Sequence, residues 1–181
     1  MTRSARMSGV NELAVTVIGF DRPGIIADVT EILAGLGMNL TDSTMTRLRG
    51  HFAMTLICVG APAAAEVEAA LAPLTAGGQL LATVRSVHPE VAAEPGGDHY
   101  VLSMHGADRL GIVAAMTRAL AAFGGNVTDL TTRLSGELYV LVAEVDLPPG
   151  TDLDALRGRL AGAATALVVE VELRPAEADL F

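Results

Sequence analysis

The chain has 181 residues, of which 51% are hydrophobic and 18% are charged, so it can build one large or two small packed domains. Its formal net charge of −9 argues against direct nucleic-acid binding, which normally requires clustered lysine and arginine. It contains no lysine and a single cysteine, Cys58, which excludes a Schiff-base or P-loop lysine, an intrachain disulfide and a multi-cysteine zinc site.

The first half of the chain predicts a strand, a helix, two strands, a helix and a strand. Residues 13–18 are rich in β-branched side chains, and residues 23–36 show apolar side chains at helical spacing. Gly37 is suited to end this helix in a left-handed turn. The following elements are expected at 38–48, 51–60, 64–75 and 80–87.

The second half predicts the same order of elements. These are a strand at 100–105, a helix marked by apolar residues between 113 and 123, strands at 125–134 and 137–147, a helix marked by leucines between 153 and 160, and a strand at 166–173.

The two halves share a duplicated motif. Residues 19–42 and 106–129 align at a constant offset of 87 and keep polar as well as apolar residues. The alignment then slips by one residue, so that Arg47 and Gly50 pair with Arg133 and Gly136. The repeat predicts an N-terminal extension at 1–12, a first domain at 13–88, a linker at 89–98, a second domain at 99–174 and a C-terminal tail at 175–181.

The βαββαβ order favours an α+β fold with two ferredoxin-like domains, each a four-stranded antiparallel sheet with two helices on one face. Residues 52–59 are apolar at both alternating positions, whereas a sheet covered on one side should alternate more cleanly. We therefore expect the bare face to pack against the other repeat or a second chain, and we expect a homodimer.

The loop between the first strand and the first helix is a candidate ligand site in both copies. Its glycine leaves the N–H groups at the helix start accessible, and these donors favour a negative group such as an amino acid carboxylate. At the other end of each helix, Asn39 and Asn126 offer a donor and an acceptor, and the nearby Asp42 and Asp129 could attract an ammonium group. A zwitterion could lie between these turns, where two repeats meet.

Purely structural roles are the alternative for the same residues. Asp21 and Asp108 could cap the helix by accepting its N–H bonds, with Pro23 fixing the first turn, and the two asparagines could only shape the turn after the helix. Arg22 and Arg109 fit neither a cap nor a tight turn, although a solvated arginine is the commoner case.

These motifs resemble the ACT domain, a small amino-acid-binding regulatory fold. Residues 21–29 (DRPGIIADV) followed by residues 37–40 (GMNL) carry the resemblance, and the two copies together cover the whole chain. The tandem arrangement is similar to that of the glycine cleavage system transcriptional repressor family. The resemblance implies a ferredoxin-like fold and effector binding at domain interfaces.

The ligand-binding residues that the resemblance implies lie in two loops of each copy. They are Asp21, Arg22, Pro23, Gly24, Ile25, Met38, Asn39 and Leu40 in the first, and Asp108, Arg109, Leu110, Gly111, Ile112, Gly125, Asn126 and Val127 in the second. The copies differ where Leu110 replaces Pro23, Ala115 replaces Asp28, and Gly125 replaces Met38 and would leave more room. The two sites therefore need not share a ligand.

The resemblance implies a non-catalytic sensor that binds a small amino acid, with glycine or serine to be tried first, and controls a protein partner such as a transcription regulator or a metabolic enzyme. One alternative is a ligand-free interaction or assembly module. Another is an in-trans regulatory subunit of an amino-acid or one-carbon metabolic enzyme.

We expect no catalytic residues, no metal and no cofactor. His51, His88, His99 and His105 show no compact ligand spacing, and no Gly-x-Ser-x-Gly motif is present. No segment approaches the ~18 uninterrupted apolar residues that span a bilayer, and residues 1–12 lack the apolar core of a signal peptide. We therefore expect a cytoplasmic protein that binds neither membrane nor nucleic acid directly.

Overall fold

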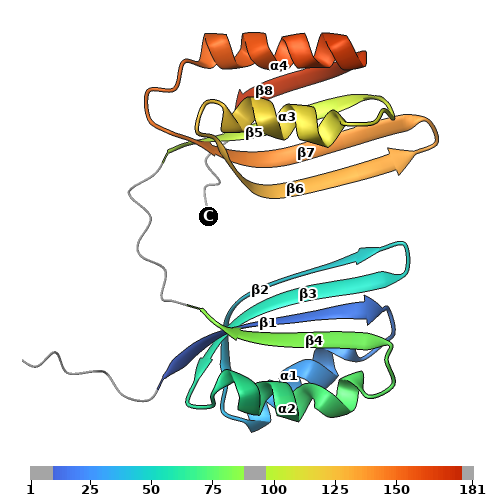
Figure 1. Ribbon diagram of the computed structural model, residues 1–181, viewed down its shortest axis with the longest axis vertical. Helices are drawn as coiled ribbons and strands as arrows, with labels where there is room; N and C mark the ends of the chain where they lie inside the picture. The colour runs from blue at the N-terminus through green and yellow to red at the C-terminus, as the bar shows by residue number, and fades with distance from the viewer. Residues whose placement is uncertain (1–9, 88–96, 177–181) are drawn as a thin grey trace, which may run out of the picture. The chain divides into compact units, whose positions relative to one another are not determined.

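The computed structural model describes residues 10–87 and 97–176, which belong to two compact units (Figure 1). The chain divides between residues 91 and 92, and each unit has a hydrophobic core of its own. The predicted N-terminal extension up to residue 9, the predicted linker up to residue 96 and the predicted tail from residue 177 lie outside the described residues.

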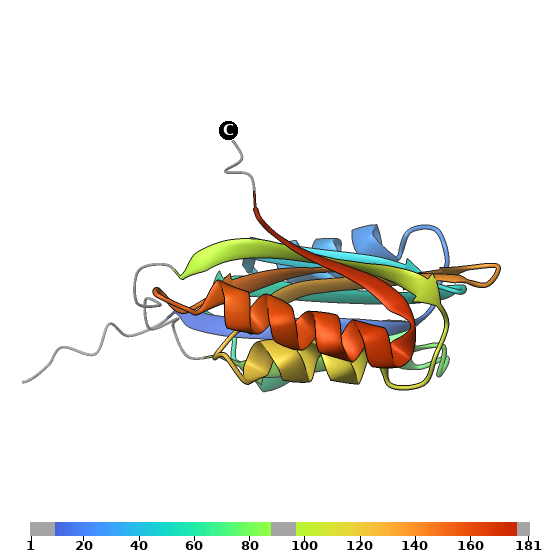
Figure 2. The same cartoon turned by 90° about the horizontal axis from the view of Figure 1, so that it is seen from above.

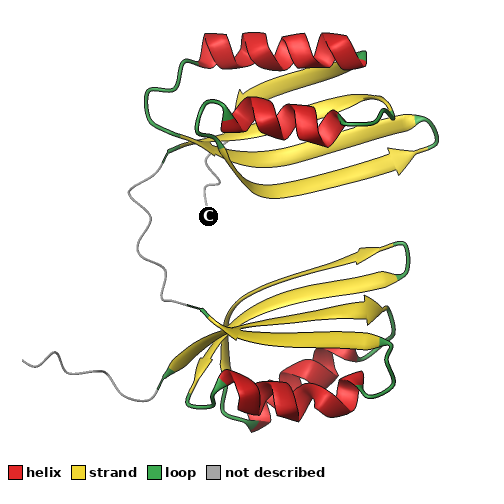
Figure 3. Cartoon of the chain, in the orientation of Figure 1, coloured by secondary structure: helices red, strands yellow, loops and turns green. Residues whose placement is uncertain are grey.

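The first unit is a βαββαβ domain. Its elements are β1 (Asn11–Phe20), α1 (Ile25–Gly35), β2 (Asn39–Leu48), β3 (His51–Gly60), α2 (Ala64–Thr75) and β4 (Leu80–Ser86). The strands form one antiparallel sheet in the order β2-β3-β1-β4. Both helices cover the same face of this sheet (Figure 3).

The second unit repeats this topology. Its elements are β5 (Asp98–Ala107), α3 (Ile112–Ala121), β6 (Asn126–Ser135), β7 (Leu138–Leu147), α4 (Leu153–Leu167) and β8 (Val169–Pro175). The sheet order is β6-β7-β5-β8, again antiparallel, and α3 and α4 lie side by side on one face (Figure 2). The predicted fold class is therefore confirmed in both halves.

Strand alternation sets the position of the core. In β1, Leu13, Val15 and Val17 point towards the helices and are at most 2% exposed, because successive side chains of a strand alternate between faces. Helix α1 meets them with buried residues at helical spacing, among them Val29 and Leu33. This packing holds the β1–α1 loop at one end of the sheet.

The sheet face away from the helices differs between the domains. A row of four threonines crosses the first sheet: Thr44, Thr55, Thr16 and Thr83. The corresponding row of the second sheet is Thr131, Val142, Ser103 and Glu172. In the next row Asp129 lies opposite Glu144, where the first sheet has Asp42 opposite Ile57. That this face packs against a partner stays a prediction.

Strand pairing corrects the predicted one-residue slip between the repeats. Arg47 lies opposite Phe52 in the first hairpin, and Leu134 lies opposite Tyr139 in the second, so the offset of 87 continues through β2 and β6. A shift of one residue moves a side chain to the other face of a sheet. Arg133 therefore faces away from the helices, whereas Arg47 faces the helix side.

The turns of the two hairpins explain the misleading alignment. The dihedral angle φ is positive at both Arg49 and Gly50, as a type I′ turn requires, but in the second turn it is positive only at Gly136, as in a type II′ turn. The glycine thus occupies the second turn position in one hairpin and the first in the other. Matching the two glycines shifts the alignment by one residue.

The last strand begins later than predicted, because helix α4 continues to Leu167 through the alanine-rich segment expected to start the strand. The Asp152 side chain caps its first turn by accepting a hydrogen bond from the Ala155 N–H at 3.0 Å. Val168 ends the helix in a left-handed conformation with φ 56°. The strand then starts at Val169.

Candidate functional site

The β1–α1 loop enters its helix through a turn that requires glycine. Gly24 has φ 91° and ψ −7°, values that match the second central position of a type II turn, and proline is favoured at the position before it. Gly111 has nearly the same angles, φ 89° and ψ 4°, with Leu110 in place of Pro23. The turn therefore depends on the glycine, and the proline is dispensable.

No side chain caps either helix. The N-cap residues of α1 and α3 are Gly24 and Gly111, and neither helix has a side-chain hydrogen bond at its cap. The alternative in which Asp21 and Asp108 cap the helices is therefore wrong. The first N–H groups of both helices remain available to a ligand, and the helix dipole favours a negative one.

In the first domain, the charged residues of this loop pair with other residues of the same domain. Arg22 donates to Asp28 Oδ2 at 2.8 Å, and Arg47 donates to Asp21 Oδ2 at 3.2 Å. The Asp21 N–H donates to the Gly50 carbonyl at 2.9 Å, which ties the loop to the β2–β3 turn. A pocket of about 540 Å³ lies here.

In the second domain, the equivalent loop forms neither ion pair among the residues described. Ala115 stands where Asp28 stands in the first domain, and Leu134 occupies the position of Arg47. Within the described residues, neither Asp108 nor Arg109 forms an ion pair. Both line a pocket of about 480 Å³, together with Tyr139, which replaces the buried Phe52 of the first domain.

The structure does not bring the two predicted clusters of one domain together. Asn39 lies opposite Val59, at the sheet end where Glu12 of β1 is paired, whereas Asp21 follows Phe20 at the other end. Glu12 and Phe20 are eight residues apart on one strand, which corresponds to roughly 26 Å. The same holds for Asn126 and the Asp108–Ile112 loop. A free amino acid cannot span this distance within one domain.

Several predicted ligand residues direct their side chains into the core. Ile25 and Ile112 are 2% exposed, Met38 is 4% exposed, and Leu40 and Val127 are half-buried against the core. These residues can therefore offer a ligand their backbone groups rather than their side chains. The side chains of Asn39 and Asn126 are exposed.

Gly125 is a packing residue and does not open space for a ligand as expected. A Cβ atom at this position would lie 2.9 Å from the Leu147 side chain and 3.1 Å from the Leu120 carbonyl. In the first domain the sizes are reversed, because Met38 fills the corresponding place and Gly60 stands where Leu147 stands. Each domain thus fills the equivalent region of its own core with one large and one small residue, at exchanged positions.

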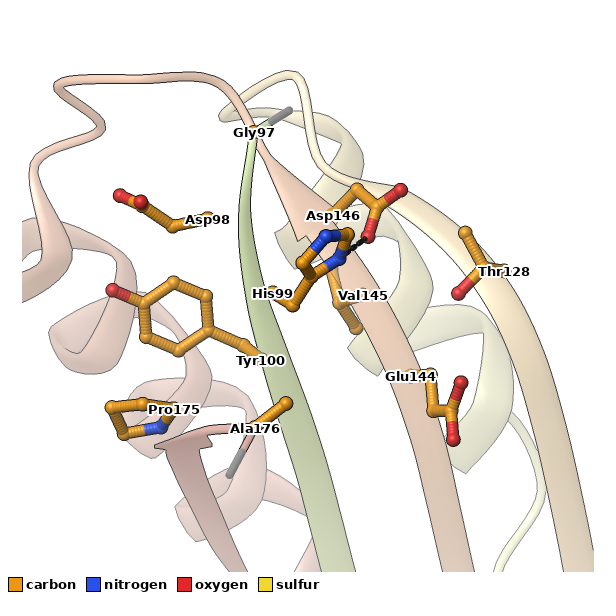
Figure 4. Close-up of a pocket in the computed structure, with 10 residues that line it drawn as sticks. All are labelled: Gly97, Asp98, His99, Tyr100, Thr128, Glu144, Val145, Asp146, Pro175 and Ala176. Atoms are coloured by element: carbon orange, nitrogen blue, oxygen red, sulfur yellow. Dashed lines mark hydrogen bonds and ion pairs between the residues drawn. The ribbon is translucent and has the colours of Figure 1, made fainter. Parts of the chain in front are cut away.

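A further pocket, of about 620 Å³, lies at the start of β5 (Figure 4). His99 Nδ1 and Asp146 Oδ1 form a hydrogen bond of 2.6 Å there, and Glu144 and Thr128 lie on the same side of the sheet. Sequence reasoning missed this pair because its partners are 47 residues apart and meet only through β5–β7 pairing. His105 Nε2 lies 3.2 Å from Glu170 Oε2, and both side chains are exposed.

In residues 10–87 and 97–176 no group of three His, Cys, Asp or Glu side chains is arranged to hold a metal ion. None of the helices described is long and apolar enough to cross a membrane.

The fold defines a tandem of two ferredoxin-like domains. The family model of the ACT domain matches residues 11–82 and 98–174, which is most of both units. The chain therefore belongs to the ACT domain family.

Relatives with known sequences or structures fit this assignment. An unknown protein from Galdieria sulphuraria has a TM-score of 0.79 at 26% identity, with 93% of this chain and 99% of that chain covered. A candidate glycine cleavage system transcriptional repressor has a TM-score of 0.69 at 20% identity with the same coverage, which shows the shared fold. A UPF0237 protein of Methanopyrus kandleri is 49% identical over 43 residues, 24% of this chain and 48% of that protein. The chain spans about half the length of the curated relatives it matches.

Proposed function

We propose that this chain is a non-catalytic regulatory protein that senses a small amino acid. The observation that carries the proposal is the ACT domain match in both halves of the chain. The uncapped starts of α1 and α3 support it, because each offers N–H donors to a carboxylate. Glycine and serine are the first ligands to test, by family analogy.

The ligand would be shared between two ACT domains. Within one domain, the β1–α1 loop and the start of β2 lie at opposite ends of the sheet. Antiparallel pairing of two β2 edge strands would place the Asn39 end of one strand beside the Leu48 end, and hence the Asp21 loop, of the other. The same reasoning applies to β6 and the Asp108 loop. A second copy of the chain would complete the site.

The edge strands support assembly into a homodimer. Every residue of β2 except Leu40 is exposed, and an edge strand presents unpaired N–H and C=O groups. Met45 on the helix-facing side of β2 is 48% exposed, and Ile26 of α1 is 45% exposed. Pairing with a second copy would bury both the strand edge and these apolar side chains.

The proposed output is control of a protein partner. A shared ligand would favour one arrangement of the domains, and a partner that reads this arrangement would respond to the amino acid concentration. The candidate partners are a DNA-binding regulator of glycine cleavage, by analogy with the repressor of the same fold, and a metabolic enzyme. The net charge of −9 favours the indirect route over direct DNA contact.

Thermal unfolding against the twenty amino acids tests the proposal. A ligand that binds only the folded state should stabilise it by about 2.7 kcal/mol at a hundred times its dissociation constant. We expect a shift for one or two amino acids, together with a dimeric mass in light scattering. No shift at millimolar concentrations, with a stable dimer, would favour the interaction module instead.

A further inference from the structure

The β1–α1 and β5–α3 loops have the same backbone conformation but differ in whether their charged side chains form ion pairs. The Arg22 guanidinium is held by Asp28 at 2.8 Å, and Asp21 is held by Arg47 at 3.2 Å, so the first loop is neutralised from within its own domain. In the second loop, Ala115 removes the first partner and Leu134 removes the second.

Within the part of the chain that the structure describes, this difference leaves one cation and one anion on the second loop without an ion-pair partner. Among the residues that the structure describes, Asp108 and Arg109 make no ion pair, and both line the pocket beside Tyr139. The loop backbones match, since Gly24 and Gly111 have nearly equal dihedral angles. The difference between the two loops is therefore one of charge pairing and not of backbone shape.

We propose that the second domain holds the zwitterion, with Arg109 binding its carboxylate and Asp108 its ammonium group, and that the Arg22–Asp28 and Arg47–Asp21 pairs keep the first loop closed to the same ligand. This inference rests on the proposed function. A ligand at the first loop would have to break existing ion pairs. At the second loop it supplies the missing partners, and charge-assisted hydrogen bonds between arginine and carboxylate are among the strong ones.

The Tyr139 hydroxyl adds to the contrast. Phe52 is 2% exposed and lines the first pocket with an apolar ring, whereas Tyr139 is half-buried and can bring a donor and acceptor to the rim of the second. Both chemical differences make the second pocket the more polar one.

Exchanging the residue that pairs with the loop arginine, Asp28 in the first domain and Ala115 in the second, tests the inference directly. Ala115→Asp installs in the second domain the carboxylate that holds Arg22 in the first, and Ala115→Asn is its neutral control. With glycine and serine as probes and backbone amide NMR as the readout, we expect shifts at Gly111 and Ile112 in the wild type. A115D should weaken binding by up to about five-fold, the worth of one exposed ion pair, and A115N should leave it nearly unchanged.

The converse variant opens the first loop. Asp28→Ala should add shifts at Gly24 and Ile25 that the wild type lacks. Acetate, which has a carboxylate without an ammonium group, should bind more weakly than glycine and be insensitive to Asp108→Asn. Shifts confined to the first loop, or equal effects of A115D and A115N, would overturn the inference.

Arginine modification provides a readout that needs no amino acid. Phenylglyoxal should modify Arg109 faster than Arg22 in the wild type, and Asp28→Asn should raise the rate at Arg22. Equal rates would remove the premise of the inference. A wild type that shows faster Arg109 modification but no response to any amino acid would count against the proposed function and the zwitterion assignment, while leaving the charge difference established.

Discussion

Gly24 and Gly35 lie at the two ends of helix α1 but have different backbone requirements. Gly24 has φ 91°, which L-residues rarely adopt, whereas Gly35 is helical and a Cβ atom there would meet nothing within 4 Å. The same substitution should therefore have opposite effects at the two positions.

We expect Gly24→Ala to lower the free energy of unfolding by roughly 1–2 kcal/mol, the cost of a left-handed L-residue. Gly35→Ala should raise it by about 0.5–1 kcal/mol, because alanine loses less backbone entropy in a helix. Urea unfolding followed by circular dichroism measures both. Equal destabilisation by the two variants would contradict the type II turn.

The pairs Met38/Gly60 and Gly125/Leu147 fill equivalent regions with reversed sizes, so the residues of each pair should be energetically coupled. Gly125→Met should cost about 1–3 kcal/mol through overpacking, and Leu147→Gly about 2–5 kcal/mol through the lost side chain and the cavity. The double variant reproduces the first domain's arrangement and should cost less than the sum. Strict additivity in a double-mutant cycle, within about 0.5 kcal/mol, would refute the coupling.

At the scale of the elements, the end of α4 contains a strained residue. Val168 has φ 56°, a left-handed backbone conformation that is unfavourable for a β-branched residue. Its side chain is 68% exposed, so packing contributes little to offset this strain. Glycine adopts that conformation without steric cost.

Val168→Gly should therefore stabilise the protein by roughly 1 kcal/mol, the lower end of the left-handed penalty. Val168→Ala keeps a Cβ atom and serves as the control, which should give little gain. Thermal unfolding distinguishes the two. A lower melting temperature for V168G than for V168A would show that the valine contributes packing that outweighs its strain.

The hairpins show how an element can be placed correctly while its side chains are not. The sequence locates both hairpins, because their apolar runs are bounded by turn residues. It misassigns Arg133, because a one-residue slip caused by Gly136 reverses the face on which every following side chain appears. Only strand pairing resolves such a slip.

At the scale of the whole molecule, two units with separate cores should unfold separately. Cys58 is the only cysteine and is fully buried in the first core, so its labelling reports on the first unit alone. Burial also raises the pKa of the Cys58 thiol, which lowers the fraction of reactive thiolate in the folded state.

We expect Gly24→Ala to accelerate Cys58 labelling by a thiol reagent about five-fold or more, following the lost stability of roughly 1 kcal/mol. Gly111→Ala, the matched change in the second unit, should leave the labelling rate unchanged. Equal acceleration by both variants would show that the units unfold as one.

The sequence by itself determined the two domains, their order of elements and the loops that could bind a ligand, because periodicity, turn glycines and an internal repeat are local signals along the chain. Tertiary structure decided which of those residues can act together. It placed Asn39 far from Asp21 within one domain, turned Met38 into the core, made Gly125 a packing residue and paired His99 with Asp146. These outcomes depend on strand register and on contacts between distant residues, which no local pattern encodes.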